Sequence, residues 1–146
     1  MANEDLKELY PNLTKRLESF RGLEDKWNGY GAQAIEDADI GLAYDVLEEL
    51  YNLAEKENKL LPEPFASVGA GGGNYPIIQY EWTIGEKEFE LEFSRTPFGP
   101  LEERKHFGWL LARSQDERSW EEGEFDVCLE DRLAIKEFIS WLPDKE

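Results

Sequence analysis

The stretch that decides the fold is PIIQYEWTIGEKEFELEF, residues 76–93. Apolar and polar side chains alternate along both halves, which is the period of a β-strand with one buried and one wet face. The apolar positions are Ile78, Tyr80, Trp82, Phe89, Leu91 and Phe93. Gly85 marks a turn between the two halves. The stretch therefore predicts a β-hairpin with one apolar face and one acidic face.

The polar positions of this hairpin are rich in glutamate. Glu88, Glu90 and Glu92 recur at every second residue, about 6.7 Å apart along a strand. Glu81 can lie on the same face, across the hairpin. We predict that these carboxylates form a rigid array. The alternative is an ordinary exposed face, polar because one side of an antiparallel sheet meets water.

Helical periodicity appears on both sides of the hairpin. Residues 4–21 repeat leucines at three- and four-residue spacing, and Pro11 either begins a second helix or kinks a single one. Residues 37–57 give the clearest helix, with Asp37 as its expected cap and an apolar stripe that can pack on a sheet. A last helix is expected over about residues 131–142.

The remaining strands are expected within about residues 65–128. The segment HFGWLLA (106–112) is typical of a buried strand, and another strand is expected around SWEE or EFDVCL. The segment GAGGGN (69–74) predicts a hairpin loop, because it lacks the Lys-Ser/Thr and the following helix of a phosphate-binding loop. We predict a single domain over residues 1–146. Its class is α+β: an antiparallel sheet of four or five strands with helices packed on one face.

Composition limits the partners of this chain. Its 33 Asp and Glu against 16 Lys and Arg give a formal net charge of −17. Such a surface repels nucleic acid and anionic membranes and attracts basic proteins. An aromatic content of 13% argues against a disordered acidic tail. The N-terminal residues do not have the pattern of a signal peptide, and no apolar run approaches the ~18 residues that span a bilayer. We therefore expect a cytoplasmic protein.

Residues that catalyse reactions are scarce. His106 and Cys128 are the single histidine and cysteine, so neither a zinc-ligand pair nor an internal disulfide is expected. No serine has the G-x-S-x-G context. We predict a protein that is no enzyme, with no catalytic residue, metal or cofactor. The enzymatic alternative is a carboxyl group with a raised pKa beside a tryptophan, such as Asp25 or Glu81.

The segment KWNGYGA, residues 26–32, predicts a structural clasp between two helices. Trp27 can bury a large apolar area, whose truncation to alanine would cost roughly 3–5 kcal/mol. Gly29 and Gly31 allow positive φ or a close backbone approach. A binding loop is the alternative. Trp82, on the apolar face of the hairpin, is also assigned a structural role.

Taken together, these motifs resemble a group of small uncharacterised bacterial and phage proteins. The group has a W-(D/N)-G-x-(G/D)-(A/S) loop, a helix, a proline-bearing strand entry and a strand ending in hydrophobic-E-W before a glutamate-rich strand. The matching residues, within about 23–95, are Trp27, Asn28, Gly29, Gly31, Ala32, Pro64, Glu81, Trp82, Glu90 and Glu92. The chain departs from the group where Gln33-Ala34-Ile35-Glu36 replaces Pro-x-Ser. The resemblance implies a fold and carriage on mobile or prophage DNA, and attaches no activity.

The functional prediction is a non-enzymatic acidic binding protein of a phage or mobile element. It would mimic nucleic acid and inhibit a basic nucleic-acid-handling protein, such as a defence nuclease complex, without binding nucleic acid or membrane itself. One alternative is an antitoxin or immunity protein against a basic toxin. Another is an accessory subunit, favoured by an apolar patch around Trp109, Trp120 or Trp141. The predicted binding residues are Glu81, Glu88, Glu90 and Glu92, with a second acidic cluster of Asp116, Glu117, Glu121, Glu122 and Glu124.

Overall fold

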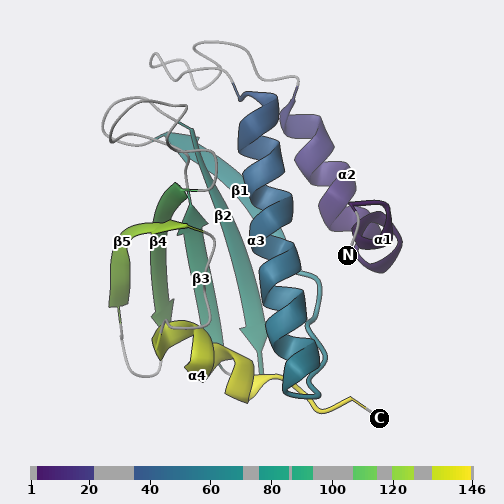
Figure 1. The fold of residues 1–146 in the computed structure, drawn as a ribbon, viewed down its shortest axis with the longest axis vertical. Helices are drawn as coiled ribbons and strands as arrows, with labels where there is room; N and C mark the ends of the chain where they lie inside the picture. Colours follow the sequence, from purple (N-terminus) through teal and green to yellow (C-terminus); the bar gives the residue numbers. More distant parts are fainter. Residues whose placement is uncertain are drawn as a thin grey trace.

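The computed structural model describes residues 3–21, 35–70, 76–85, 87–93, 107–114, 120–126 and 133–145. Helices and strands follow along these residues as three helices, a run of strands and a last helix (Figure 1). The helices are α1 (Asn3–Leu9), α2 (Pro11–Phe20), α3 (Asp37–Lys56) and α4 (Leu133–Trp141). The strands are β1 (Phe65–Ala70), β2 (Pro76–Ile84), β3 (Lys87–Phe93), β4 (Phe107–Ser114) and β5 (Trp120–Asp126).

Over the described residues, the strands form one antiparallel sheet in the order β1-β2-β3-β4-β5. Strands β2 and β3 pair as far as Ile84 opposite Lys87, so residues 85 and 86 join them. Gly85 has a φ of 63°, a left-handed conformation that disfavours residues with a Cβ. The predicted hairpin is therefore confirmed, and so is the α+β class with an antiparallel sheet.

The apolar face of the hairpin is the centre of the core. Its members are at most 2% exposed and are Ile78, Tyr80, Trp82, Phe89, Leu91 and Phe93. The Phe138 ring from α4 stacks on Phe89 at 4.2 Å between centroids and lies 4.9 Å from the Trp82 ring. The Tyr80 hydroxyl donates a 2.6 Å hydrogen bond to the Ala43 carbonyl of α3. Aromatic contacts and a buried hydrogen bond thus join helices α3 and α4 to the same face of β2 and β3.

Trp82 combines an apolar ring with a satisfied polar group. Its side chain is 2% exposed, and its Nε1–H donates a 2.8 Å hydrogen bond to the Pro62 carbonyl oxygen. Buried tryptophan needs such an acceptor for its indole N–H. The bond fixes the segment that leads from α3 into β1. Trp27, Gly29 and Gly31, the predicted clasp, lie outside the described residues.

Two separate helices occupy the N-terminal region. Pro11 is the first residue of α2, which is the first of the two outcomes expected for this proline. A proline at this position removes no helical hydrogen bond, because the first N–H groups of a helix have no partner within it. Arg16 of α2 donates from Nε to the Ala66 carbonyl, and its guanidinium lies 4.5 Å from the Phe65 ring centroid. These contacts attach α2 to β1.

The start of α3 corrects one expectation. Glu36, rather than Asp37, is the N-cap, with extended φ and ψ of −97° and 163°. Its backbone N–H donates a 2.8 Å hydrogen bond to the Asp39 carboxylate. Asp37 is instead the first helical residue, and its carboxylate pairs with Arg21. The prediction that Asp37 caps the helix was wrong. The helical backbone begins at Asp37 itself, so the cap position falls one residue earlier, at Glu36.

The end of α3 is fixed by a Schellman motif. Asn58 has a left-handed φ of 56°, and the Lys59 N–H donates a 2.8 Å hydrogen bond to the Ala54 carbonyl. The chain then meets the C-terminal segment: the Leu60 N–H donates to the Pro143 carbonyl at 2.8 Å. The ends of α3 and α4 are therefore held together by backbone hydrogen bonds. None of the helices in the described part of the chain has both the length and the hydropathy of a membrane span.

Candidate functional site

The polar face of the β2–β3 hairpin carries the glutamates predicted for binding. Strand pairing sets Glu81 directly opposite Glu90. Glu88 and Glu92 lie two residues to either side of Glu90 on β3, and all four residues are partly exposed. Because alternate residues of a strand share a face, these side chains occupy the side opposite the aromatic core. We call this patch the acidic face: Glu81, Glu88, Glu90 and Glu92.

The acidic face concentrates negative charge on a fixed backbone. Directly opposed residues of an antiparallel pair have Cβ atoms about 4.5–5.5 Å apart, and like charges there destabilise the pair by roughly 0.2–1 kcal/mol. A one-residue slip would relieve the opposition of Glu81 and Glu90, but it would also turn the aromatic face into water. The core therefore holds the carboxylates in register. Local conflicts of this kind are expected at functional surfaces.

The strand register places further residues in line with the acidic face. One row of paired backbone positions crosses the sheet in the order Phe65, Glu81, Glu90, Arg113 and Trp120. Phe65 is 56% exposed and adjoins Glu81 at the edge. Arginine recognises such a surface well, because a guanidinium pairs with carboxylates and stacks on aromatic rings. Arg16 of this chain already stacks on Phe65.

Sequence reasoning missed Phe65 as a surface residue. The signal was present in FASV, residues 65–68, where Ala66 is fully buried and alternates with its partly or fully exposed neighbours. Period-two alternation therefore places Phe65 on the same face as Ser67 and Glu81. A large exposed aromatic residue among polar ones is typical of an interface anchor.

The second acidic cluster is described only in part, and only as backbone. Asp116 and Glu117 lie outside the described residues, while Glu121, Glu122 and Glu124 belong to β5. Consecutive residues of a strand alternate between faces, so the position of Glu121 falls on the opposite face from the other two. The backbone of β5 thus separates the position of Glu121 from those of Glu122 and Glu124, and the second acidic cluster stays a prediction.

Glu122 falls in register with the acidic face. Strand pairing sets Leu111 opposite Glu92 on one side and opposite Glu122 on the other. Neighbouring strands lie about 4.8 Å apart, so the backbones of Glu92 and Glu122 are separated by roughly 10 Å. The backbone positions of β5 thus extend the row of acidic residues across the sheet.

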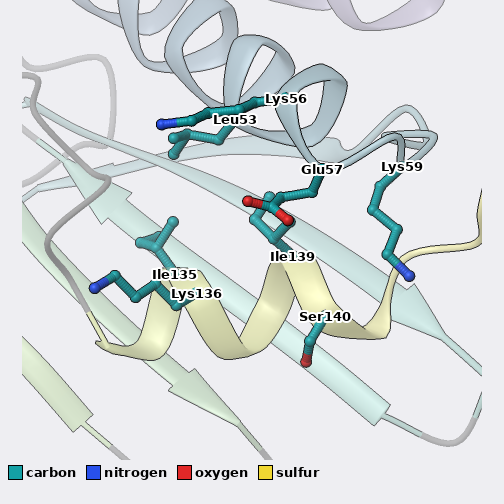
Figure 2. A pocket seen from close by; sticks show the side chains of 8 residues that line it. All are labelled: Leu53, Lys56, Glu57, Lys59, Ile135, Lys136, Ile139 and Ser140. Atoms are coloured by element: carbon teal, nitrogen blue, oxygen red, sulfur yellow. The ribbon is translucent and has the colours of Figure 1, made fainter.

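A second surface, which the sequence did not predict, lies between α3 and α4 (Figure 2). It is a cavity of about 590 Å³. Its apolar walls come from Leu53, Ile135 and Ile139, and the basic residues that line it are Lys56, Lys59 and Lys136. We call this cavity the α3–α4 groove. Sequence patterns could not predict it, because its walls come from segments about 80 residues apart.

The residues that sequence reasoning considered for metal binding or catalysis can be followed in part. In the part of the chain that the structure describes, no three His, Cys, Asp or Glu side chains gather in a way that could hold a metal ion. Glu81 and Trp82 lie on opposite faces of β2, so the tryptophan does not enclose that carboxyl group. Asp25, His106 and Cys128 lie outside the described residues.

The apolar patch proposed for a subunit interface is described only at Trp141. This residue is partly buried, and its ring lies 6.3 Å from the Phe138 ring. The Lys87 ammonium lies 4.8 Å from the Trp141 ring centroid, a cation–π contact. Trp109 and Trp120 belong to β4 and β5, of which the backbone is described. Trp141 thus packs against the core and makes a cation–π contact with Lys87.

No protein-family model, curated protein or solved structure matches this chain. The resemblance to bacterial and phage proteins therefore stays a prediction. Function has to be argued from the geometry of the two surfaces, since a fold alone does not identify it.

Proposed function

We propose that this chain is a non-enzymatic binding protein whose acidic face holds a basic nucleic-acid-handling protein and thereby inhibits it. The observation that carries the proposal is the register that sets Glu81 against Glu90, with Glu88 and Glu92 on the same strand face. The proposal includes a sheet of five strands covered by helices on one face only. The acidic face then remains open to a partner.

A rigid array makes these carboxylates better ligands than the same charges on flexible loops. The side chains stand about 6.7 Å apart along β3, and β2 lies about 4.8 Å away. Little conformational freedom of the backbone is lost when a partner binds, so more of the interaction energy appears as affinity. A partner cation can also contact Glu81 and Glu90 together, because strand pairing sets the two residues directly opposite each other. Both effects favour a partner that presents several fixed cations.

Arginine-rich surfaces that handle nucleic acid meet this requirement. Proteins that bind phosphate backbones present arginine and lysine in a groove, and binding depends strongly on salt. Phe65, 56% exposed beside Glu81, adds a ring on which a guanidinium can stack. A protein that occupies the groove in place of nucleic acid acts as an inhibitor. A cytoplasmic location and carriage by a phage or mobile element belong to the same proposal.

An antitoxin against a basic toxin would use the same surface, so the identity of the captured protein separates the two roles. The test is affinity capture from host lysate at low and moderate salt, with and without nuclease treatment, followed by mass spectrometry. We expect a basic nucleic-acid-binding protein that is retained after nuclease treatment and lost as salt rises.

The matched baits make the capture specific to the acidic face. One bait carries Glu81→Gln, Glu88→Gln, Glu90→Gln and Glu92→Gln, and the control carries Glu8→Gln, Asp45→Asn, Glu48→Gln and Glu49→Gln on the helices. Both variants lose the same formal charge. The proposal requires that only the first loses the partner. Equal retention by both variants, or the absence of any specific protein, would overturn it.

A further inference from the structure

We infer that the α3–α4 groove is a binding site for a small amphipathic anion, an alkyl or aryl chain that ends in a single carboxylate or phosphate. This inference is independent of the proposed function, because the groove shares no residue with the acidic face. It rests on the shape of the cavity, the chemistry of its walls and the placement of its lysines.

The apolar walls fit a hydrocarbon chain. Leu53 is partly exposed on the α3 wall, while Ile135 and Ile139, 0% and 5% exposed and one helical turn apart on α4, form the floor of the groove as part of the core. Figure 2 shows these side chains lining the groove. A volume of about 590 Å³ lies within the ~300–1,000 Å³ of small-molecule sites. Burying a chain here would contribute roughly 0.8 kcal/mol for each CH₂ group.

The lysines make the two ends of the groove different in charge. Lys56 on α3 and Lys136 on α4 extend their ammonium groups toward the same end of the groove, from opposite walls (Figure 2). At the other end the Lys59 ammonium already pairs with the Asp144 carboxylate at 2.8 Å. Glu57 also lines the groove and repels an anion from its middle. An anionic head group is therefore directed to the end that Lys56 and Lys136 share.

The basic lining of the groove stands out against the rest of the chain. Acidic residues outnumber basic ones by 33 to 16 in the whole sequence, yet Lys56, Lys59 and Lys136 line one cavity. A pair of lysines on a chain of charge −17 selects an anion, and the adjoining Leu53 and isoleucines select an apolar body. The combination fits an amphipathic anion better than a bare phosphate or a neutral lipid.

The groove is also held in shape before a ligand arrives. The Schellman motif at Asn58 and the hydrogen bonds from Leu60 to Pro143 and from Lys145 to Asn58 join the ends of α3 and α4. The last two bonds measure 2.8 and 2.9 Å. A preformed site spends less binding energy on ordering its walls. The end of the groove near Asn58 and Pro143 is therefore held in place, and the head group is directed to the other end, beside Lys56 and Lys136.

The experiment uses probes with one tail and three head groups. The purified full chain is titrated with decanoate, decanol and decyltrimethylammonium below their micelle concentrations, and the methyl NMR signals of Leu53, Ile135 and Ile139 are followed. We expect decanoate to shift these signals and to bind roughly tenfold or more tightly than decanol, the effect of one charge-assisted contact. Decyl phosphate shows whether a phosphate head serves as well as a carboxylate.

Variants separate the lysine end from general electrostatics. Lys56→Gln with Lys136→Gln should reduce decanoate affinity to that of decanol, while Lys7→Gln with Lys15→Gln, on α1 and α2, should leave it unchanged. Thermal unfolding checks that both variants fold. Equal binding of decanoate and decanol, or an unchanged affinity in the Lys56/Lys136 variant, would overturn the inference. So would silent methyl signals, which would mean that another segment or a protein partner fills the groove.

Discussion

The two faces of the β2–β3 hairpin share one backbone and differ in every other respect. The inner face holds six apolar residues, each at most 2% exposed, among them Tyr80, Trp82 and Phe89. The outer face holds Glu81, directly opposite Glu90, both partly exposed. The inner face contributes the stability that keeps the outer face in register. Substitutions should therefore separate the faces: inner ones reduce stability, and outer ones change binding.

The largest effect is expected at Phe138, which packs on the inner face from α4. Phe138→Ala removes a ring stacked at 4.2 Å on Phe89 and 4.9 Å from Trp82. A buried phenylalanine truncated to alanine loses about 3–5 kcal/mol of unfolding free energy. Urea denaturation measures the change, and Phe138→Leu, which fills most of the volume, is the control. A loss below ~1 kcal/mol would mean that α4 does not pack on the hairpin.

The next effect concerns Tyr80, which joins the inner face to α3. Tyr80→Phe removes the hydrogen bond to the Ala43 carbonyl and should cost about 1 kcal/mol at neutral pH. Burial raises the pKa of Tyr80 well above its ordinary value, and the nearby Tyr44 adds to the rise. The native state then keeps a proton that the unfolded state releases above pH ~10, so stability falls as pH rises past that point.

Denaturation at several alkaline pH values tests the sign and the source of this effect. The wild type should lose stability steadily above pH ~10, by at most about 1.4 kcal/mol per pH unit for each such tyrosine. Tyr80→Phe should show a shallower slope. An identical slope in the two proteins would show that Tyr80 does not carry the alkaline transition.

The turn that sets the two faces in register gives a smaller effect. Gly85 has a φ of 63°, and a Cβ added there would meet no atom within 4 Å. Gly85→Ala should therefore cost only the backbone strain of a left-handed residue, about 1–2 kcal/mol, and Gly85→Asn should cost less. Chemical denaturation of the two variants gives the comparison. Equal stabilities of the Ala and Asn variants would mean that residue 85 does not adopt the left-handed conformation.

The sequence predicted one of these faces better than it predicted the other surfaces. Strict alternation from Ile78 to Phe93 determined the hairpin, because one slip exposes the whole aromatic face. Pro11 left two helical arrangements open, since a proline both starts and kinks helices. Glu36 was missed as the cap of α3. Whether Glu36 or Asp37 caps the helix depended on backbone angles that residue preferences do not specify.

The α3–α4 groove was beyond sequence reasoning for a different reason. Lys56 and Lys136 stand on helices whose own patterns are ordinary. Only the meeting of the helix ends, fixed by the bonds around Asn58 and Pro143, brings the two lysines to one cavity. Phe65 is the intermediate case, because its exposure was readable from period-two alternation in β1 once the strand was placed.

The smallest effect on stability belongs to the outer face and has the opposite sign. Glu81→Gln removes one of two opposed carboxylates and should raise the unfolding free energy by roughly 0.2–1 kcal/mol. Glu8→Gln, an exposed residue of α1, is the control and should change little. Careful denaturation at low salt resolves the difference. A clear loss of stability in Glu81→Gln would show that the carboxylates of this face support the fold.

The most direct test of the central claim is the affinity for an oligo-arginine peptide, measured by calorimetry at low and moderate salt. Three proteins are compared: the wild type, the Glu81/Glu88/Glu90/Glu92→Gln variant and the helix control Glu8/Asp45/Glu48/Glu49 variant of equal charge. Our account predicts that the acidic-face variant binds at least roughly tenfold more weakly than the control and unfolds at the same or higher urea concentration. Equal weakening of both variants would contradict it, because net charge rather than the ordered carboxylates would then hold the partner.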